Sequence, residues 1–208
     1  MKTLILDTSS DYLYIYLNSE KDEYEVVLEG KNNHSEKMMD LIEEGLNKLN
    51  LEVKDLDRII CGIGPGSYTG LRVSLTVCKI FAWTAKIDLY TISSLDILGS
   101  EYLDKDGRYA ICNIAKKDYL YSKIVDVKNG EANVVEDDMF ILKEEFLNRL
   151  DKDIQVIDNE KFAFNSKNII RYAKNKVDDI HNLVPNYLRK ANSWNIKLEK
   201  WQLMISMM

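Results

Sequence analysis

Histidine, proline and cysteine are scarce in this chain of 208 residues, which contains two, two and three of them. His34 and His181 stand far apart in the sequence, and neither has a second histidine at the spacing of a metal-binding helix face. The three cysteines are odd in number, widely spaced and set among apolar neighbours, so they predict reduced core thiols. The composition therefore argues against histidine-pair metal sites and against a disulfide-stabilised secreted domain.

A long apolar run and an excess of positive charge are also missing. No stretch approaches the ~20 uncharged apolar residues that a membrane helix needs. Asp7 follows only three apolar residues, so we expect neither a membrane span nor a signal peptide. The net charge of -6 argues against strong nucleic-acid binding by the chain alone, because contacts to phosphates dominate that affinity. These features predict a cytoplasmic protein, and they leave open a subunit of an RNA-modifying complex.

The first half of the chain alternates between strand and helix patterns. Tyrosines alternate with Leu and Ile from Asp11 to Leu17, which is the period of a strand. Asn33 and Glu36 have the spacing of a capping box at the start of a helix. The expected order βββαβαβα indicates an α/β lobe with a mixed sheet over residues 1–103. We expect its strands at 2–8, 11–17, 23–29, 58–63 and 89–92, and its helices at 33–49, 67–85 and 93–103.

Composition shifts near residues 104–107, where we place the boundary to a second, smaller and more charged lobe over residues 104–184. A C-terminal helical tail is predicted over residues 185–208, because its large apolar residues recur at spacings of four and three. That stripe consists of Trp194, Leu198, Trp201, Ile205 and Met208. In the second lobe we expect strands at 108–115, 119–127 and 154–157, and helices at 143–150 and 166–176.

Residues 61–72 read C-G-I-G-P-G-S-Y-T-G-L-R and hold four of the nine glycines. They follow an apolar strand and open a helix, so the turn suits either a bound anion or a closely packed neighbour. The Walker and dinucleotide patterns both fail, because Ser67 and Thr69 stand where those patterns need glycine. A strand-to-helix turn that packs closely is therefore the favoured interpretation.

The helix after the glycine turn has two apolar stripes, one through Leu71 and Leu75 and a second through Val73 and Val77. A helix that is apolar nearly all round must be buried nearly all round, so a neighbouring helix or another protein has to cover the second stripe. The helix near residue 35 is the expected neighbour. The pattern leaves open whether both helices are core or form an exposed patch. The candidate partner interface consists of Met38, Met39, Leu41, Ile42, Leu71, Leu75, Val77, Cys78 and Ala82.

Four segments together resemble the TsaB family, also called YeaZ. They are L-D-T-S at 6–9, G-P-G-S-Y-T-G-L-R at 64–72, I-S-S-L-D at 92–96 and P-N-Y-L-R at 185–189. They occur in the family's order and span nearly the whole chain. The second lobe matches less well, since Ile114 replaces the acid that opens the family's D-A-R-x-x-E-V-Y segment.

The resemblance implies an actin-like ATPase (ASKHA) fold with two lobes, each a mixed sheet flanked by helices. It implies a non-catalytic subunit that supports TsaD, with the ATPase TsaE, in threonylcarbamoyladenosine modification of tRNA. In the family the dimer forms through helices of the N-terminal lobe. We therefore expect a TsaD-like and a TsaE-like partner, tRNA contact only through the complex, and a homodimer when the chain is isolated.

The resemblance also bears on catalysis, because the catalytic sister carries a metal-binding H-x-x-x-H. Ser94 and Leu98 stand at those two positions, and neither can replace an imidazole ligand. We therefore expect no catalytic residues, metal or cofactor, although weak ATP or ADP binding at a complex interface stays open. The alternative is an ATP-dependent enzyme or peptidase of the same fold. The candidate vestigial nucleotide loop consists of Asp7, Thr8, Ser9, Gly64, Gly66 and Ser67.

Overall fold

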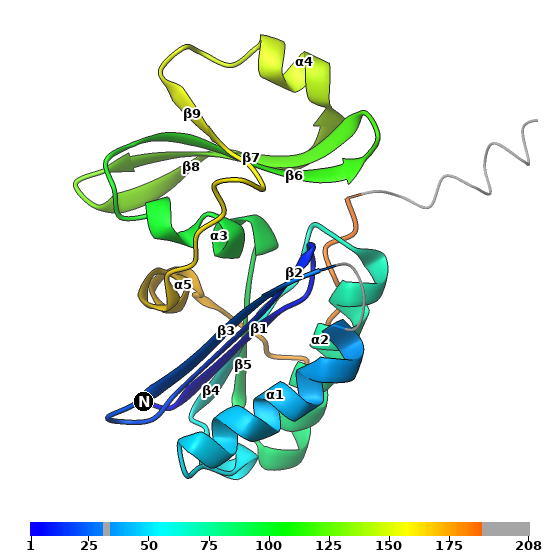
Figure 1. The fold of residues 1–208 in the computed structure, drawn as a ribbon, viewed down its shortest axis with the longest axis vertical. Helices are drawn as coiled ribbons and strands as arrows, with labels where there is room; N and C mark the ends of the chain where they lie inside the picture. Colours follow the sequence, from blue (N-terminus) through cyan, green and yellow to red (C-terminus); the bar gives the residue numbers. More distant parts are fainter. Residues whose placement is uncertain (31–33, 189–208) are drawn as a thin grey trace, which may run out of the picture.

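The computed structural model describes residues 1–30 and 34–188 and contains two β-sheets with helices between and outside them (Figure 1). The first sheet has the strand order β10-β5-β4-β1-β2-β3. Strands β1, β4 and β5 run parallel, whereas β2, β3 and β10 are antiparallel to their neighbours, so the sheet is mixed as expected. Its strands are β1 (Thr3–Asp7), β2 (Tyr12–Asn18), β3 (Glu23–Glu29), β4 (Arg58–Gly62), β5 (Asp88–Ile92) and β10 (Asn175–Lys176).

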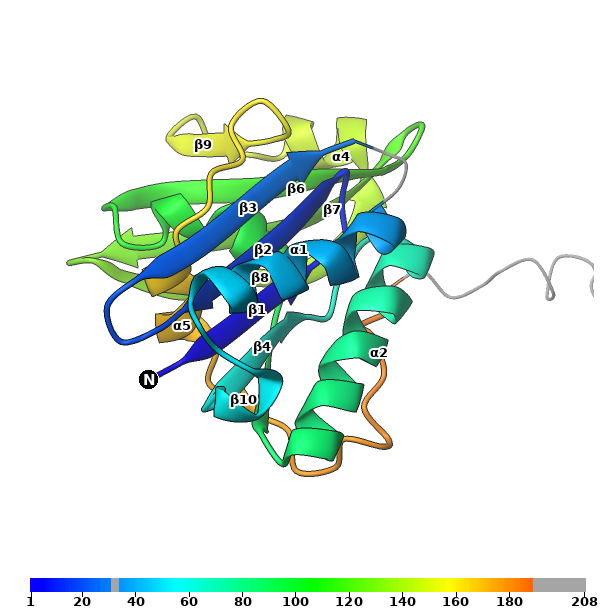
Figure 2. The same ribbon diagram turned by 60° about the horizontal axis from the view of Figure 1, so that its bottom comes forward.

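Both faces of the first sheet are covered, so β2 is buried on its tyrosine face as well as on its aliphatic face. Ile15 belongs to the core beneath α1 (His34–Lys48) and α2 (Tyr68–Ala85), which lie side by side on one face (Figure 2). Tyr14 belongs to a second core on the opposite face, and its hydroxyl donates to Glu25 Oε1 at 2.7 Å. The strand that the alternation predicted over residues 11–17 is therefore confirmed as β2.

The second sheet has the order β8-β7-β6-β9 and is also mixed, because β9 runs parallel to β6. Its elements are β6 (Gly107–Lys116), β7 (Tyr119–Lys128), β8 (Glu131–Leu142), β9 (Ile154–Ile157) and the outer helix α4 (Lys143–Asn148). Strand β8 was not predicted. Its sequence, E-A-N-V-V-E-D-D-M-F-I-L, lacks alternation because β8 is an edge strand with register shifts against β7.

Between the sheets lie α3 (Ser94–Leu98), the 3-10 turn η2 (Ser100–Tyr102) and α5 (Ser166–Tyr172). The predicted helix over 93–103 is thus divided in two at Gly99, where an added Cβ would lie 2.5 Å from Ile111 Cδ1. We predicted α5 within a second lobe that continues to residue 184. It instead packs on the first sheet through Ile169, and β10 pairs with β5.

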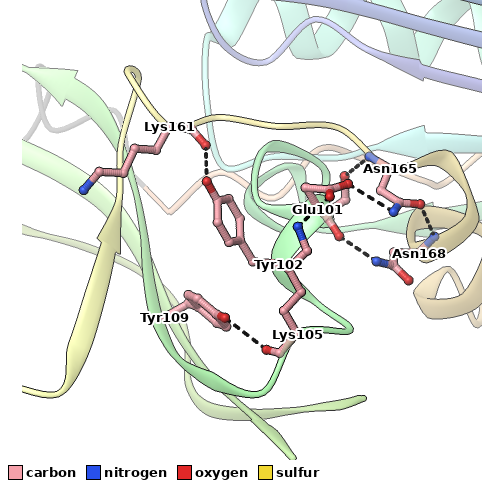
Figure 3. Close-up of polar contacts among 8 residues, drawn as sticks. Glu101, Tyr102, Lys105, Tyr109, Lys161, Asn165 and Asn168 are labelled. Carbon is pink, nitrogen blue, oxygen red and sulfur yellow. Dashed lines mark hydrogen bonds and ion pairs between the residues drawn. The ribbon is translucent and has the colours of Figure 1, made fainter.

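Hydrogen bonds from side-chain amides at the start of α5 connect this helix to η2 and hold α5 between the sheets (Figure 3). Asn165 Nδ2 donates to Glu101 Oε2 at 3.1 Å, and Asn168 Nδ2 donates to Ser100 O at 2.9 Å. The Tyr102 hydroxyl donates to the Lys161 carbonyl at 3.0 Å in the same region. These bonds are between residues about 60 apart, so local periodicity could not reveal them.

Two predictions fall wholly or partly outside the described residues. One is the capping residue Asn33, and the other is the helical tail, whose stripe from Trp194 to Met208 lies outside the described residues. The first four residues of the predicted tail, 185–188, are described, and they contain neither helix nor strand.

The core beneath α1 and α2 contains most of the predicted interface residues. Six of the nine are buried, so the expectation that their side chains face a partner is wrong for this structure. The apolar stripe of α2 that we chose packs on the sheet, and the exposed residues belong to its other stripe. The buried residues are Met38, Ile42, Leu71, Leu75, Cys78 and Ala82.

Met38→Ala tests this assignment, because Met38 is 1% exposed and its neighbour Met39 is 43% exposed. We expect Met38→Ala to lower the free energy of unfolding by roughly 2–5 kcal/mol, through lost burial and a cavity. Met39→Ala should change it by less than about 0.5 kcal/mol. Urea denaturation followed by circular dichroism measures both. Equal effects of the two substitutions would contradict the assignment.

Candidate functional site

The glycine turn packs directly against the turn that follows β1. A Cβ added to Gly66 would lie 2.2 Å from the Ser9 carbonyl oxygen, and one added to Gly70 would lie 1.8 Å from that of Thr8. The Ser67 N–H donates to the Ser9 carbonyl at 2.6 Å, and Thr8 Oγ1 donates to the Gly70 carbonyl at 2.7 Å. Glycine is therefore needed for close approach of two backbones. The Ser67 N–H and the Thr8 hydroxyl are thus bonded to the protein itself.

Asp7 lies at the centre of this junction and is buried. Its Oδ1 accepts hydrogen bonds from the Ser9 N–H at 2.9 Å and the Ser9 hydroxyl at 2.7 Å, and its Oδ2 accepts from the Ser94 hydroxyl at 2.5 Å. Ser94 Oγ in turn accepts from the Gly64 N–H at 2.9 Å. Burial raises the pKa of Asp7 above its ordinary value of 3.8, and the hydrogen bonds from Ser94 and Ser9 oppose that shift.

The late P-N-Y-L segment contacts the glycine turn, although about 120 residues separate them. The Asn186 N–H donates to the Ile63 carbonyl at 2.7 Å. The Tyr187 ring stacks on Tyr68 with 5.1 Å between centroids, and its hydroxyl accepts from Arg72 Nε at 3.0 Å. Sequence reasoning identified both motifs, but nothing in the spacing indicated that they touch.

Residues 177–188, which we call the strap, run from the end of β10 along α2 (Figure 2). Lys79, the single charged residue between positions 73 and 85, donates from Nζ to the carbonyls of His181 at 2.8 Å and Leu183 at 3.1 Å. The Trp83 and His181 rings pack edge to face, with 5.6 Å between their centroids. The ammonium group of Lys79 is thus directed at the strap.

A fully uncharged band remains uncovered on α2, and we call it the α2 outer face. Ile80 is 51% exposed and Trp83 is 62% exposed, while Val73 and Val77 are half-buried at its edge. Exposed apolar surface of this kind is typical of a protein interface. The α2 outer face consists of Thr69, Val73, Thr76, Val77, Ile80, Trp83 and Thr84.

Three of the nine predicted interface residues remain accessible. Val77 is on the α2 outer face, and Met39 and Leu41 are at least partly exposed on α1. Ile80 and Trp83 were missed, although the second stripe through Val73 and Val77 was the signal for them.

Metal-binding and thiol groups among the described residues bear on catalysis by this chain. No group of three or more His, Cys, Asp and Glu residues within them could hold a metal ion. All three cysteines are free and buried, as predicted, and burial raises the pKa of Cys112 to about 12, so its thiolate is scarce at neutral pH. Leu98, at one position of the sister family's metal motif, is buried, and Ser94 at the other bonds Asp7.

Gly70→Ala tests the close approach of the two turns. Alanine favours a helix over glycine by about 1 kcal/mol, so helix propensity alone predicts a gain in stability. We expect a loss of about 1–3 kcal/mol instead, because the added methyl must displace the Thr8 backbone. Thr76→Ala, at an exposed position of the same helix, is the matched control and should be near neutral. Chemical denaturation compares them, and a stabilised Gly70→Ala protein would refute the constraint.

Asp7→Asn tests the buried carboxyl by its pH dependence. Because the folded protein holds the Asp7 proton more tightly than the unfolded chain, this residue makes wild-type stability fall as pH rises above about 4. Asparagine carries no charge, so the stability of Asp7→Asn relative to wild type should rise between pH 4 and pH 7. Thermal melts across that range measure the difference, with the exposed Asp40→Asn as control. A difference that does not change with pH would contradict the assigned shift.

Comparison with known proteins agrees with this architecture. The family model described as "TsaD: tRNA N6-adenosine threonylcarbamoyltransferase" matches residues 28–168. The protein "tRNA threonylcarbamoyladenosine biosynthesis protein TsaB" of Bacillus subtilis is 28% identical, over 93% of this chain and 96% of its own. That of Buchnera aphidicola subsp. Acyrthosiphon pisum is 25% identical, over 79% and 78%.

A solved structure gives the same fold. "YeaZ from Pseudomonas aeruginosa" superposes with a TM-score of 0.75 and 17% sequence identity, covering 90% of this chain and 99% of that one. The expected actin-like fold with two mixed sheets is thereby confirmed. The chain therefore belongs to the TsaD family of tRNA N6-adenosine threonylcarbamoyltransferases, within which it is a member of the TsaB (YeaZ) group.

Proposed function

We propose that this chain is a non-catalytic subunit that binds a TsaD-like catalytic subunit in the synthesis of threonylcarbamoyladenosine in tRNA. The names of its relatives support the pathway. The α2 outer face is the observation that carries the proposal, because it leaves Ile80 and Trp83 exposed on a helix whose other sides are packed. A partner that covers this face would bury them and gain the corresponding hydrophobic free energy.

A supporting rather than catalytic role is favoured by the interior of the first lobe. Ser94 and Leu98 take part in internal contacts at the positions where the catalytic sister has its histidines. The Thr8 hydroxyl and the Ser67 N–H, which a nucleotide phosphate would need, bond to backbone carbonyls of the same junction. We therefore propose that the isolated chain needs no cofactor, and that any weak binding of ATP or ADP takes place at the interface of the assembled complex.

The remaining partners would be reached through the assembled complex. We propose that the TsaE-like ATPase joins the pair, and that tRNA is bound by the complex rather than by this acidic chain, whose net charge is -6. None of the helices described here has the length and apolarity to cross a membrane. A cytoplasmic location is consistent with a partner role in tRNA modification.

The same apolar face can pair with a second copy when the catalytic subunit is absent. A symmetric dimer would place the same patch on both copies, which suits an uncharged helix face. We therefore propose a homodimer in isolation, formed through the α2 outer face and displaced by the TsaD-like subunit.

Ile80→Glu tests the interface directly, with Val135→Glu as matched control. Ile80 is 51% exposed on α2 and Val135 is 49% exposed on β8, so both substitutions should leave the fold intact. We expect Ile80→Glu to weaken binding of a co-expressed TsaD protein by at least about 30-fold, since burying an unpaired charge at an interface core costs 2 kcal/mol or more. Val135→Glu should bind as wild type does.

Gel filtration of the co-expressed pair is the first readout, and sedimentation of the isolated chain reports the homodimer. Modified adenosine in bulk tRNA of a strain that lacks its own TsaB is the second. Wild type and Val135→Glu should restore the modification, and Ile80→Glu should not. Unchanged co-elution of Ile80→Glu would refute the interface, and wild type that fails to restore the modification would refute the function. Micromolar binding of Mg-ATP to the isolated chain would instead favour the enzyme alternative.

A further inference from the structure

A largely buried ionic cluster joins the second sheet to α3, and the proposed function does not use it. Lys123 Nζ on β7 lies 2.7 Å from Asp96 Oδ2 on α3 and 4.0 Å from Asp138 Oδ1 on β8. The three side chains are 6%, 16% and 8% exposed. Two carboxylates thus face one ammonium group in a region of low dielectric, so ionisation of both acids leaves one negative charge without an ion-pair partner.

Asp138 has the most connections in this cluster. Its Oδ1 accepts from the Ser93 hydroxyl at 2.8 Å, and Ser93 caps α3 by accepting from the Leu95 N–H. Its Oδ2 accepts from Asn186 Nδ2 in the strap at 3.4 Å. Asp138 therefore connects β8 with the start of α3 and with the strap, which are far apart in the sequence.

We propose that Asp138 is a proton-controlled latch, which holds the strap and the start of α3 against the second sheet and releases them when its carboxyl loses its proton. Release of Asn186 would loosen the adjacent Tyr187, which stacks on Tyr68 at the start of α2. The second sheet is thereby coupled to the end of the helix that carries the α2 outer face. The inference goes beyond the proposed function, because the latch operates in the isolated chain.

The charges around Asp138 set the direction of the response. The pKa of Asp138 is raised to about 6: burial is the largest cause, Asp96 and Asp137 act in the same direction, and Lys123 and the Ser93 hydroxyl oppose the shift. Opening to water would return the carboxyl to its ordinary pKa of 3.8. The open state is therefore favoured as pH rises, and linkage between these two values predicts an increase of about tenfold in the opening equilibrium from pH 5 to pH 7.5.

Hydrogen exchange of the full chain measures this opening. The reporters are the Ser94 and Asn186 amides, which donate to the Gly64 and Ile63 carbonyls. After correction for the intrinsic pH dependence of exchange, we expect their protection to fall about tenfold from pH 5 to pH 7.5. Asp138→Asn has nearly the same shape without the charge, so it should reduce this change to less than about twofold. Asp126→Asn, on β7 of the same sheet, should retain it.

The amides of β1 serve as the internal reference, because they exchange only when the core opens. A pH response at Ser94 and Asn186 that exceeds the response of β1 supports the latch. An equal response at all three places would mean that only global stability depends on pH, and this would overturn the proposal. A pH-independent wild type, or an Asp138→Asn protein that responds like wild type, would overturn it as well. Thermal melts of both variants establish that they are folded.

Discussion

The close approach of two backbone turns is the constraint on which the rest of this structure depends. Gly66 and Gly70 lie against the carbonyls of Ser9 and Thr8, at distances that any side chain would obstruct. This contact fixes where α2 begins relative to β1, and so fixes which stripe of α2 meets the sheet. A helix placed otherwise would bury a different set of residues and expose a different face.

The functional surface follows from what covers α2. The stripe through Leu75 packs on the first sheet, and the side of α2 that carries Lys79 contacts the strap. The face through Ile80 is left largely exposed by the described residues, although the Trp83 ring at its edge contacts His181 of the strap. Both charged residues of α2 contact the strap: Arg72 donates to the Tyr187 hydroxyl, and Lys79 donates to the carbonyls of His181 and Leu183. The exposed face carries no polar side chains other than those of its threonines, which suits association with another protein.

Two adjacent serines connect the two sheets through buried acids. Ser94 donates to Asp7 on the first sheet, and Ser93 donates to Asp138 on the second. Burial raises the pKa of both acids, because it disfavours the ionised carboxylate, and the hydrogen bonds from the serine hydroxyls oppose that shift. The I-S-S-L-D segment thus acts as the junction of the molecule. In the sequence it indicated only a helix cap and a family resemblance.

The sequence by itself determined strands β1 to β5 of the first sheet, the glycine turn, the helix after it and the family, because periodicity and glycine placement are local properties. It did not determine β10, whose residues 175–176 fell in the helix expected over 166–176. Only the tertiary structure decided that Leu75 is core and Ile80 is surface, since both stripes are apolar and burial depends on which neighbour each one meets. It also decided the positions of β8, α5 and the strap, and the pairing of Ser93 with Asp138. These features depend on contacts between residues tens of positions apart, which no local pattern encodes.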